Sequence, residues 1–477
     1  MRVVSVVIPL VVLCACPGPG SHVLPGGAPA KQQPPTVPPV VAPPLNPPVA
    51  PPVTPPAAGC AQAPLVVLRE TQLLTVNVAG EETPLFQFGA STGHPADAVV
   101  VQDWQQQPGF LGAVAFLHDP PSAHRYEFVL LRADGTVLFH HVEEQPHNPD
   151  IFLSPQGSLA VSGEHNFVAF PDGRVTELGG YSPAVPSMDG QHILVSQGPS
   201  WRANARYGWL RLMDLAFTPL ARTAEWMTFV VVGNHVMALP HDGQRSGPLL
   251  RTSPGLETVV AAELTTNAAL DVVSQAGGRW LLLQRSADSL VRVNVEDGTA
   301  SVVDGMLGAR QLWGVWTASV ATDGSIQFST AREDGLLQLQ RTADLGATFV
   351  DVGQPMEAGP DMGLGARLVA LRKGDNTLIL NLSSGYGDFL QEVQLVSAEG
   401  VQRESTGGLY VNADIHPGAA DLSGDGSCVA TVAQRQGTAF SEDSIYELVF
   451  LDAVTGTRTV HAWEHPYQTQ LRFLQRP

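Results

Sequence analysis

The chain has 477 residues, of which 44% are hydrophobic and only 15% are charged, so it is long enough to bury a large core in one domain or several. This composition excludes disorder along the whole length. A formal net charge of -19 argues against a protein that grips phosphate backbones, because neutralising phosphates requires clustered Lys and Arg. We therefore expect no nucleic acid partner.

Residues 1–15 have the pattern of a signal peptide. Arg2 precedes an apolar run, Val3 to Ala15, that is too short to span a bilayer. Leu13-Cys14-Ala15-Cys16 resembles the lipobox of bacterial lipoproteins, which implies a diacylglycerol thioether and usually an N-acyl chain on Cys16. Two or three acyl chains hold a protein durably in a bilayer. We expect an exported protein anchored through Cys16 in the cell envelope, with Pro17 favouring the outer membrane; an ordinary secretory signal is the alternative.

Residues 16–59 have the composition of a tether. Between Pro17 and Gly59 there are 16 prolines and no aromatic residue, so this stretch cannot form a core. Proline fixes its own backbone angle and biases the preceding residue toward extended geometry, which predicts a disordered, stiff polyproline II stalk. Its expected role is a spacer between membrane and domain; a docking ligand for aromatic-lined grooves is the alternative.

Residues 60–477 show the pattern of an all-β domain. No apolar run of 18 residues occurs in them, so no further membrane span is expected. Short apolar or alternating runs predict strands at Phe128–Leu131, Val137–Phe139, Ile193–Val195, Thr228–Val232, Trp280–Leu283, Leu290–Val295, Leu378–Leu382 and Leu448–Leu451. Between them lie Asp-Gly pairs, the dipeptide that favours tight hairpins, with their aspartates at 134, 172, 189, 242, 297, 304, 323, 334 and 425.

Three of the turns share a form. They occupy residues 153–161, 186–194 and 422–430, and each resembles the Ser-Pro-Asp-Gly hairpin of many β-propeller blades. A single four-stranded blade cannot bury both faces, whereas blades stacked around an axis can, so repetition every 40 to 60 residues or so is expected. Dividing residues 60–477 by such periods gives about seven to ten blades. With long loops we expect a β-propeller of seven blades, within a range of six to eight.

A further segment resembles the Asp-box of sialidase-type propellers. All five fixed positions of the box are present: Thr342, Asp344, Gly346, Thr348 and Phe349. The resemblance implies a structural hairpin in which the Asp accepts hydrogen bonds from turn amides, the Gly takes an unusual backbone angle and the Phe fills the blade core. We find one strict copy, and neither the sialidase arginine triad nor its Tyr/Glu pair.

Two motifs match enzyme signatures by sequence alone. Residues 89–93 satisfy the G-x-S-x-G pattern, but a nucleophile elbow requires a following helix, and no helical pattern follows. Residues 461–465 read H-x-x-E-H, but the zinc-protease motif requires a downstream acidic ligand, and the last 12 residues contain none. We predict a loop for the first, a terminal strand and turn for the second, and no catalytic residue in either.

Two groups of potential metal ligands also have structural explanations. On the strand predicted around residue 139, alternate side chains point to opposite faces, which separates His140, His141, Glu143, Glu144 and His147. A calcium loop beginning at Asp421, Ser423 and Asp425 would need a bidentate Glu where Val432 stands. We therefore expect no metal and no cofactor.

Cys60 and Cys428 lie at the entry to the domain and in a late repeat. Export would place both in an oxidising compartment, and a propeller commonly closes its ring by pairing strands from the two chain ends. We predict a disulfide between them; two buried thiols are the alternative.

The sequence does not identify a specific activity. We expect a propeller that presents loops to a protein or glycan partner, with contact residues among Trp201, Tyr207, Trp209, Trp313, Trp316 and Tyr386, most of which we assign to blade cores. A glycan-directed hydrolase of the sialidase-like propeller type is the alternative, and it would need two facing carboxylates at the axis. A structural scaffold is a third interpretation.

Overall fold

The computed structural model describes residues 59–474, with gaps at 120–122, 146–147, 187–189, 198–204, 223–225, 234, 243–245, 262–263, 265–270, 277, 287–288, 305–317, 358–366, 385–387, 412–418, 437–443 and 464–469. Every described residue belongs to one compact unit, Pro56–Pro477. The predictions for the signal peptide, for Cys16 and for the stalk up to residue 58 lie outside the described residues.

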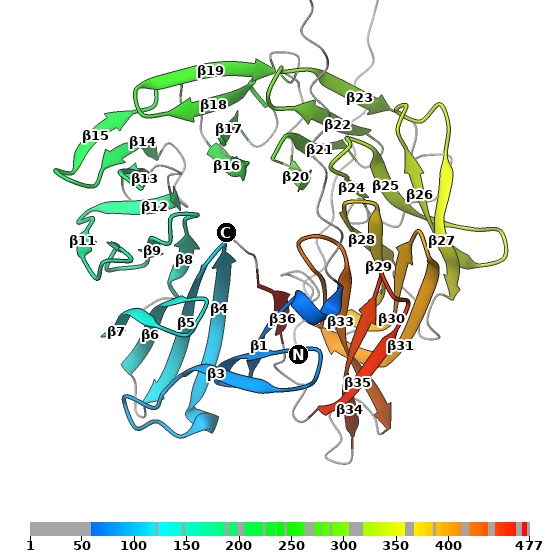
Figure 1. The fold of residues 1–477 in the computed structure, drawn as a ribbon. Coiled ribbons are helices and arrows are strands. Elements are labelled where there is room, and N and C mark those ends of the chain that lie inside the picture. Colours follow the sequence, from blue (N-terminus) through cyan, green and yellow to red (C-terminus); the bar gives the residue numbers. More distant parts are fainter. Residues whose placement is uncertain are drawn as a thin grey trace, which may run out of the picture. The chain divides into compact units, whose positions relative to one another are not determined.

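The described residues form nine four-stranded antiparallel sheets, arranged as the blades of a β-propeller (Figure 1). Blade 1 contains β36 (Gln470–Phe473), β1 (Leu65–Arg69), β2 (Gln72–Val76) and β3 (Glu82–Gln87). Each other blade consists of four consecutive strands, the first of which lies nearest the axis. Two 3-10 turns, η1 (Cys60–Gln62) and η2 (Ala96–Ala98), flank blade 1.

Blades 2 to 5 follow in chain order. Blade 2 contains β4 (Val99–Gln107), β5 (Phe110–Asp119), β6 (Ala123–Arg132) and β7 (Val137–Glu144), and blade 3 contains β8 (Asp150–Leu153), β9 (Leu159–Ser162), β10 (Phe167–Ala169) and β11 (Val175–Glu177). Blade 4 contains β12 (Tyr181–Pro186), β13 (His192–Gln197), β14 (Arg206–Arg211) and β15 (Ala216–Pro219), and blade 5 contains β16 (Trp226–Val232), β17 (His235–His241), β18 (Leu249–Ser253) and β19 (Leu256–Ala261).

Blades 6 to 9 complete the series. Blade 6 contains β20 (Asp271–Ala276), β21 (Trp280–Ser286), β22 (Ser289–Asn294) and β23 (Ala300–Asp304), and blade 7 contains β24 (Ala318–Val320), β25 (Ile326–Ala331), β26 (Leu336–Thr342) and β27 (Val350–Glu357). Blade 8 contains β28 (Arg367–Lys373), β29 (Asn376–Ser384), β30 (Asp388–Ser397) and β31 (Gly400–Val411), and blade 9 contains β32 (Ala420–Leu422), β33 (Cys428–Gln436), β34 (Ile445–Asp452) and β35 (Arg458–Trp463).

The propeller fold and the all-β class are confirmed, but the expected number of seven blades is wrong, because the structure has nine. The expectation assumed long loops between strands. Blade 3 instead runs only from Asp150 to Glu177, with strands of three or four residues joined by tight turns. Short blades of this kind leave room for two more sheets in the same length of chain.

The predicted hairpins explain why the blades need so few residues. All eight predicted strands overlap strands of the structure. The six Asp-Gly pairs described at both residues each lie in a tight turn between consecutive strands, and their glycines have positive φ: Gly135, Gly173, Gly298, Gly324, Gly335 and Gly426. Only glycine adopts this backbone region without strain. These pairs therefore mark where one strand ends and the next begins.

The three repeated turns occupy equivalent positions. They join the innermost strand to the second strand in blades 3, 4 and 9. The turn in blade 9 also packs on the preceding blade, since a Cβ at Gly426 would lie 2.3 Å from the carbonyl oxygen of Lys373 at the end of β28. Glycine is required there both for its backbone angle and for this close approach.

The hydrophobic core lies between blades. Among the described residues there are eight buried clusters, and each contains side chains of neighbouring blades. The largest joins blades 8 and 9 to blade 1, with Leu380, Leu448, Leu65 and Phe473 among its members. Because every blade buries both faces against its neighbours, no blade has a complete core alone.

The ring closes through the C-terminal strand. β36 pairs antiparallel with β1, so that Phe473 lies opposite Leu65 and Gln470 opposite Leu68. The edge of β36 away from β1 is also held, because the Phe473 backbone N–H donates to Asp421 Oδ2 on β32 at 2.7 Å and its carbonyl accepts from Gln106 Nε2 on β4 at 2.7 Å. The last strand is therefore bound by three blades.

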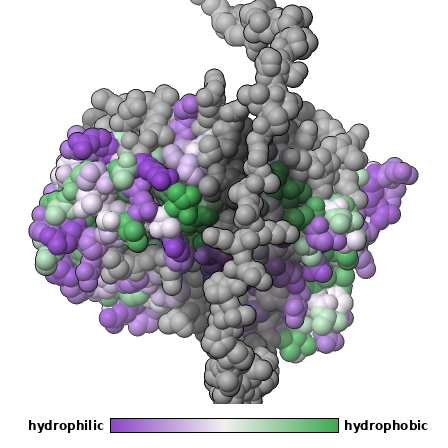
Figure 2. All heavy atoms as spheres, turned by 90° about the horizontal axis from the view of Figure 1, so that it is seen from above, coloured by the Kyte–Doolittle hydropathy of each residue, from purple (hydrophilic) through white to green (hydrophobic). Residues whose placement is uncertain are grey.

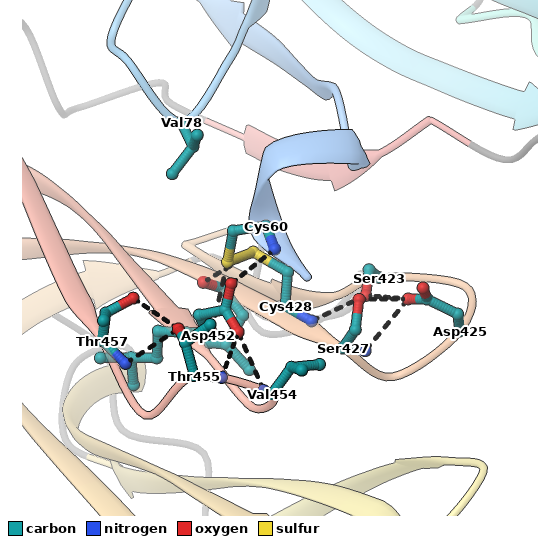
Figure 3. Close-up of a disulfide and its surroundings, with 12 residues drawn as sticks. Cys60, Val78, Ser423, Asp425, Ser427, Cys428, Asp452, Val454, Thr455 and Thr457 are labelled. Atoms are coloured by element: carbon teal, nitrogen blue, oxygen red, sulfur yellow. Dashed lines mark hydrogen bonds between the residues drawn. A yellow bond between two sulfur atoms is a disulfide. The ribbon is translucent and has the colours of Figure 1, made fainter. Parts of the chain in front are cut away.

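A disulfide joins Cys60 to Cys428 on β33, with a Cα–Cα distance of 4.8 Å (Figure 3). The same entry point is held by Asp452, whose Oδ2 accepts from the Cys60 N–H at 2.9 Å and whose Oδ1 accepts from the N–H groups of Val454 and Thr455. Burial would raise the pKa of Asp452, but these hydrogen bonds outweigh it and lower the pKa. The start of the domain is thus fixed on blade 9.

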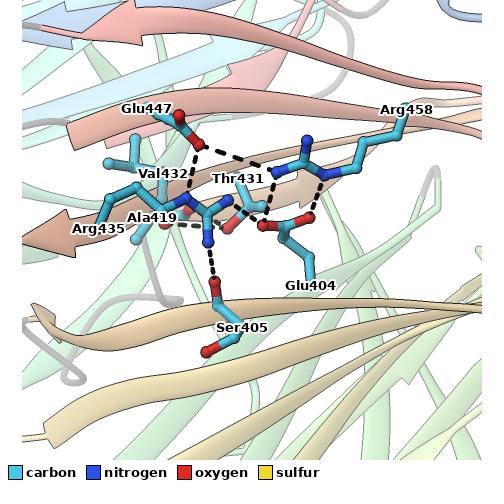
Figure 4. A network of polar contacts seen from close by, with 8 residues as sticks. All are labelled: Glu404, Ser405, Ala419, Thr431, Val432, Arg435, Glu447 and Arg458. Carbon is cyan, nitrogen blue, oxygen red and sulfur yellow. Dashed lines mark hydrogen bonds and ion pairs between the residues drawn. The ribbon is translucent and has the colours of Figure 1, made fainter.

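An ion network fixes blade 8 to blade 9. Glu404 on β31 has a side chain only 5% exposed, and its carboxylate binds Arg435 of β33 and Arg458 of β35 (Figure 4). Arg435 also pairs with Glu447 at 2.5 Å and donates to the Ser405 carbonyl at 2.9 Å. Burial would raise the pKa of Glu404, but the hydrogen bonds from both arginines lower it.

The surface in Figure 2 is a mosaic of hydrophilic and hydrophobic residues outside the grey areas, with no continuous apolar expanse on this face. No helix among the described residues is long and apolar enough to cross a bilayer.

Candidate functional site at the ring axis

Charged side chains gather on the innermost strands where the ring closes. Asp103 lies on β4, Asp150 is the first residue of β8, and Arg472 lies on β36, so the three come from three consecutive blades. Their strands lie side by side, since Gln106 of β4 donates to the Phe473 carbonyl of β36 at 2.7 Å and Gln105 of β4 donates to the Ile151 carbonyl of β8 at 2.6 Å. In keeping with this placement, Arg472 lowers the pKa of Asp103 and Asp150 raises it. We call Asp103, Asp150 and Arg472 the axial triad.

Trp104 and Gln105 position two members of the triad. Arg472 places its guanidinium over the ring of the buried Trp104, 4.8 Å from the centroid, a cation–π arrangement. Gln105 donates to Asp103 Oδ2 at 3.3 Å and to the Ile151 carbonyl of β8 at 2.6 Å, and it accepts from the Leu153 N–H. The glutamine thereby ties β4 to β8 and holds Asp103 beside the start of that strand.

Loss of hydration dominates the electrostatics of the triad. Burial raises the pKa of Asp103, and hydrogen bonding from Gln105 and the charge of Arg472 offset it only in part. The surrounding protein also removes enough water from Asp150 to raise its pKa, although that residue is exposed. Burial lowers the pKa of Arg472, against the charges of Asp103 and Asp421. Ionised groups that the fold does not fully stabilise are typical of functional sites.

Asp421 and Lys373 flank the triad but are already engaged. The Asp421 carboxylate accepts from the backbone N–H groups of Leu422 at 2.8 Å and Phe473 at 2.7 Å. Lys373 Nζ donates to the Leu422 carbonyl at 2.6 Å. Asp421 therefore stabilises the ring closure, and Lys373 ties blade 8 to blade 9. The Asp421, Ser423, Asp425 series is a turn, as predicted, since Asp425 accepts from Ser423 and Ser427.

The sequence motif at 89–93 lies in a loop between β3 and η2, as predicted. Ser91 Oγ donates to Glu127 Oε1 at 3.1 Å, and His140 Nε2 lies 2.8 Å from that oxygen and 3.5 Å from Ser91 Oγ. A catalytic triad needs one histidine nitrogen for the serine and the other for the carboxylate. Here one nitrogen faces both, so the cluster is a hydrogen-bond network around the buried Glu127, which also accepts from the Gly89 N–H at 2.6 Å.

The histidine-rich segment is strand β7, as predicted. His140 contacts Glu127, whereas His141 and His165 contact Glu143 at 3.3 and 3.4 Å. Within the described ranges, no three His, Cys, Asp or Glu side chains are placed to hold a metal ion. His147 lies outside the described residues, as do Glu464 and His465 of the H-x-x-E-H motif, while His461 lies on β35 and contacts the Val78 carbonyl.

The segment resembling an Asp-box joins β26 to β27. Asp344 accepts from the Thr348 N–H at 2.8 Å, the Thr348 hydroxyl at 2.6 Å and the Thr342 hydroxyl at 2.9 Å. These hydrogen bonds, led by that of Thr348, lower the pKa of Asp344 to about 2. Gly346 has φ +97°, and Phe349 meets Phe328 edge-on. The segment is a structural turn on the outer hairpin of blade 7, away from the axial triad.

The aromatic contact candidates do not form a described surface. Tyr207 and Trp209 are buried on β14, with Trp209 Nε1 donating to Thr252 at 2.8 Å, so both belong to blade cores. Trp201, Trp313, Trp316 and Tyr386 lie outside the described residues.

Sequence reasoning missed the axial triad. Its members are separated by up to 369 positions, and only the pairing of β36 with β1 brings them together. One signal was available, since Asp103 and Asp150 are charged residues within or at the start of otherwise apolar or neutral strands.

Comparison with known proteins supports the fold alone. No protein-family model matches the chain, and no curated protein matches it. A crystal structure described as the eukaryotic initiation factor is similar over 87% of this chain and 99% of its own, at 12% identity and a TM-score of 0.51. The dihydro-heme d1 dehydrogenase NirN shows 12% identity, coverage of 88% and 77%, and a TM-score of 0.42. The β-propeller domain of the Trilobed protease from Pyrococcus furiosus shows 11% identity, coverage of 64% and 95%, and a TM-score of 0.36.

Proposed function

We propose that the chain is an exported, lipid-anchored protein whose propeller binds a protein or glycan partner in the cell envelope. The leader supports the anchor, because Leu13 to Cys16 has the order of a lipobox. The observation that carries the binding role is the axial triad, whose charges are held on rigid strands and incompletely neutralised by the fold. Such preorganised polar groups suit recognition.

The anchor is tested by expressing the full chain with a labelled fatty acid. We expect label on the wild type and none on Cys16→Ser, with the variant leaving the membrane fraction. Cys14→Ser is the matched control and should keep the label. Equal labelling of wild type and Cys16→Ser, or none on either, would contradict lipidation at Cys16.

Binding is tested on a glycan array and by crosslinking on intact cells. The Asp150→Asn variant should lose most of the signal, because an ionised acceptor is replaced by a neutral amide. Asp172→Asn, at an exposed hairpin of blade 3, is the matched control and should bind like the wild type. An identical signal from all three proteins would show that the axial triad does not make the contact.

A glycan-directed hydrolase is the second candidate. Asp103 and Asp150 lie on neighbouring inner strands with raised pKa values, and a carboxyl group that retains its proton can act as a general acid. The turn at Thr342–Phe349 is what a relationship to Asp-box propellers would predict. Release of sugar from array-positive glycans by the wild type, and its loss in Asp103→Asn, would favour hydrolysis over binding; array binding without release would exclude it.

A further inference from the structure

The Arg472 guanidinium has N–H donors that no described residue uses. It stacks on Trp104, yet within the described part of the chain it makes no hydrogen bond and no ion pair. The carboxylate of Asp421 does not serve it, since that group accepts two backbone N–H groups. A guanidinium offers five N–H donors in a planar fork that matches a carboxylate. Its unused donors, beside a ring that fixes its orientation, form one half of a binding site.

Asp150 and Asp103 form the other half. Asp150 is exposed at the start of β8, and among the described residues its carboxylate has no hydrogen-bond partner. Asp103 receives one side-chain hydrogen bond, from Gln105 at 3.3 Å. Two neighbouring carboxylates with so few donors repel one another, and the charge of Arg472 offsets that of Asp103 only in part. A cation between them would relieve that repulsion.

We propose that the axial triad binds a small zwitterion, with the carboxylate of the ligand on Arg472 and its ammonium group on Asp103 and Asp150, as an amino acid or short peptide would provide. This inference rests on the proposed binding role of the same site. A ligand with only one charge would leave the opposite half of the triad unsatisfied, and charge-assisted hydrogen bonds are the stronger ones in proteins. The strands that carry the three groups are fixed by neighbouring blades, so the site is rigid before binding.

The test uses three probes that differ only in charge: glycylglycine, which carries both; N-acetylglycylglycine, which keeps only the carboxylate; and glycylglycinamide, which keeps only the ammonium group. Binding to the full chain is measured by titration calorimetry. We expect glycylglycine to bind about tenfold or more tightly than either analogue, the factor for one charge-assisted hydrogen bond.

The variants assign each charge to its partner. Arg472→Gln should weaken glycylglycine and N-acetylglycylglycine about tenfold or more without weakening glycylglycinamide. Asp150→Asn should weaken glycylglycine and glycylglycinamide by a similar factor without weakening N-acetylglycylglycine. Arg174→Gln and Asp172→Asn, which change an exposed pair on blade 3, are the matched controls. Arg472→Lys keeps the charge without the planar fork, so it should weaken carboxylate binding less than Arg472→Gln if that variant still folds.

Folding is checked by thermal unfolding of each variant. Asp150→Asn should unfold at the same temperature as the wild type or higher, because the fold disfavours the ionised form it removes. Equal affinity for the three probes, no saturable binding of glycylglycine at about 10 mM, or unaltered binding by Asp150→Asn would overturn the inference. A macromolecular partner that binds wild type and Asp150→Asn equally would leave the broader binding function standing without it.

Discussion

Glu404 illustrates how one buried charge can hold two blades together. It lies on blade 8 and receives two arginines of blade 9, which are 28% and 44% exposed. Because these arginines can be rehydrated, removing the carboxylate should cost less than in a fully buried ion pair. We expect Glu404→Gln to lower the free energy of unfolding by about 2 kcal/mol at pH 7, as measured by chemical denaturation.

The pH dependence of this effect follows from the lowered pKa of Glu404. A carboxylate with a lower pKa in the folded state stabilises the fold above its unfolded pKa of about 4.5 and loses that contribution as the pH falls through the folded value. The difference between wild type and Glu404→Gln should therefore shrink below about pH 4.5. Glu82→Gln, which breaks the more exposed pair with Arg69, is the control and should cost less than about 1 kcal/mol. No difference at pH 7 would refute a stabilising role for Glu404.

At the scale of elements, the strands were more predictable than the blades. Each Asp-Gly pair reverses the direction of the chain locally, so its structural effect depends on neighbouring residues alone. The predicted strands around residues 130, 194 and 380 are all present. The number of blades depends on how many residues each sheet uses. Strand length varies from the short strands of blade 3 to the long β31, Gly400–Val411, and no local sequence pattern predicts how many residues a sheet will use.

The last strand should be indispensable. Deleting residues 470–477 removes β36, exposes the edge of β1 with the buried Leu65 and Val67, and takes from Asp421 one of its two backbone N–H donors. We expect this truncation to unfold at a much lower temperature or to aggregate, as followed by circular dichroism and size-exclusion chromatography. Deleting only 475–477 is the control and should be neutral. A truncated chain that unfolds like the wild type would mean that β36 does not close the ring.

A synthetic peptide of residues 466–477 sharpens this test. Added to the truncated chain, it should restore part of the thermal stability in a concentration-dependent way, because binding to the folded state alone stabilises it. A scrambled peptide of the same composition should not.

At the scale of the whole molecule, the closure of the ring could be predicted from the sequence only through the resemblance to β-propellers. Cys60 and Cys428 are the two cysteines of the domain, so their pairing could be predicted once a ring was assumed. Asp103, Asp150 and Arg472 could not be grouped in this way, since charged residues are common and the apolar or neutral surroundings that mark Asp103 and Asp150 do not connect them with Arg472. The site exists because the first and last strands of the domain meet.

The disulfide should be detectable by alkylation, and it should raise the free energy of unfolding. Alkylation of the denatured, unreduced protein followed by peptide mapping should leave Cys60 and Cys428 unlabelled. Its sequence separation of 368 residues means that the cross-link restricts the unfolded chain strongly, so replacing both cysteines by serine should lower the free energy of unfolding by about 3–5 kcal/mol. Labelling of both cysteines without reductant would show that they are free thiols.

The position of Cys60 also decides how the domain responds to being pulled from its N-terminal side. Tension arriving through residue 59 reaches the cross-linked cysteine before it reaches β1, and the covalent bond passes the load to β33 in the middle of blade 9. The hydrogen bonds between β1 and β36 are then sheltered from peeling. A reducing environment would remove that shelter and expose the closing strands to the full force.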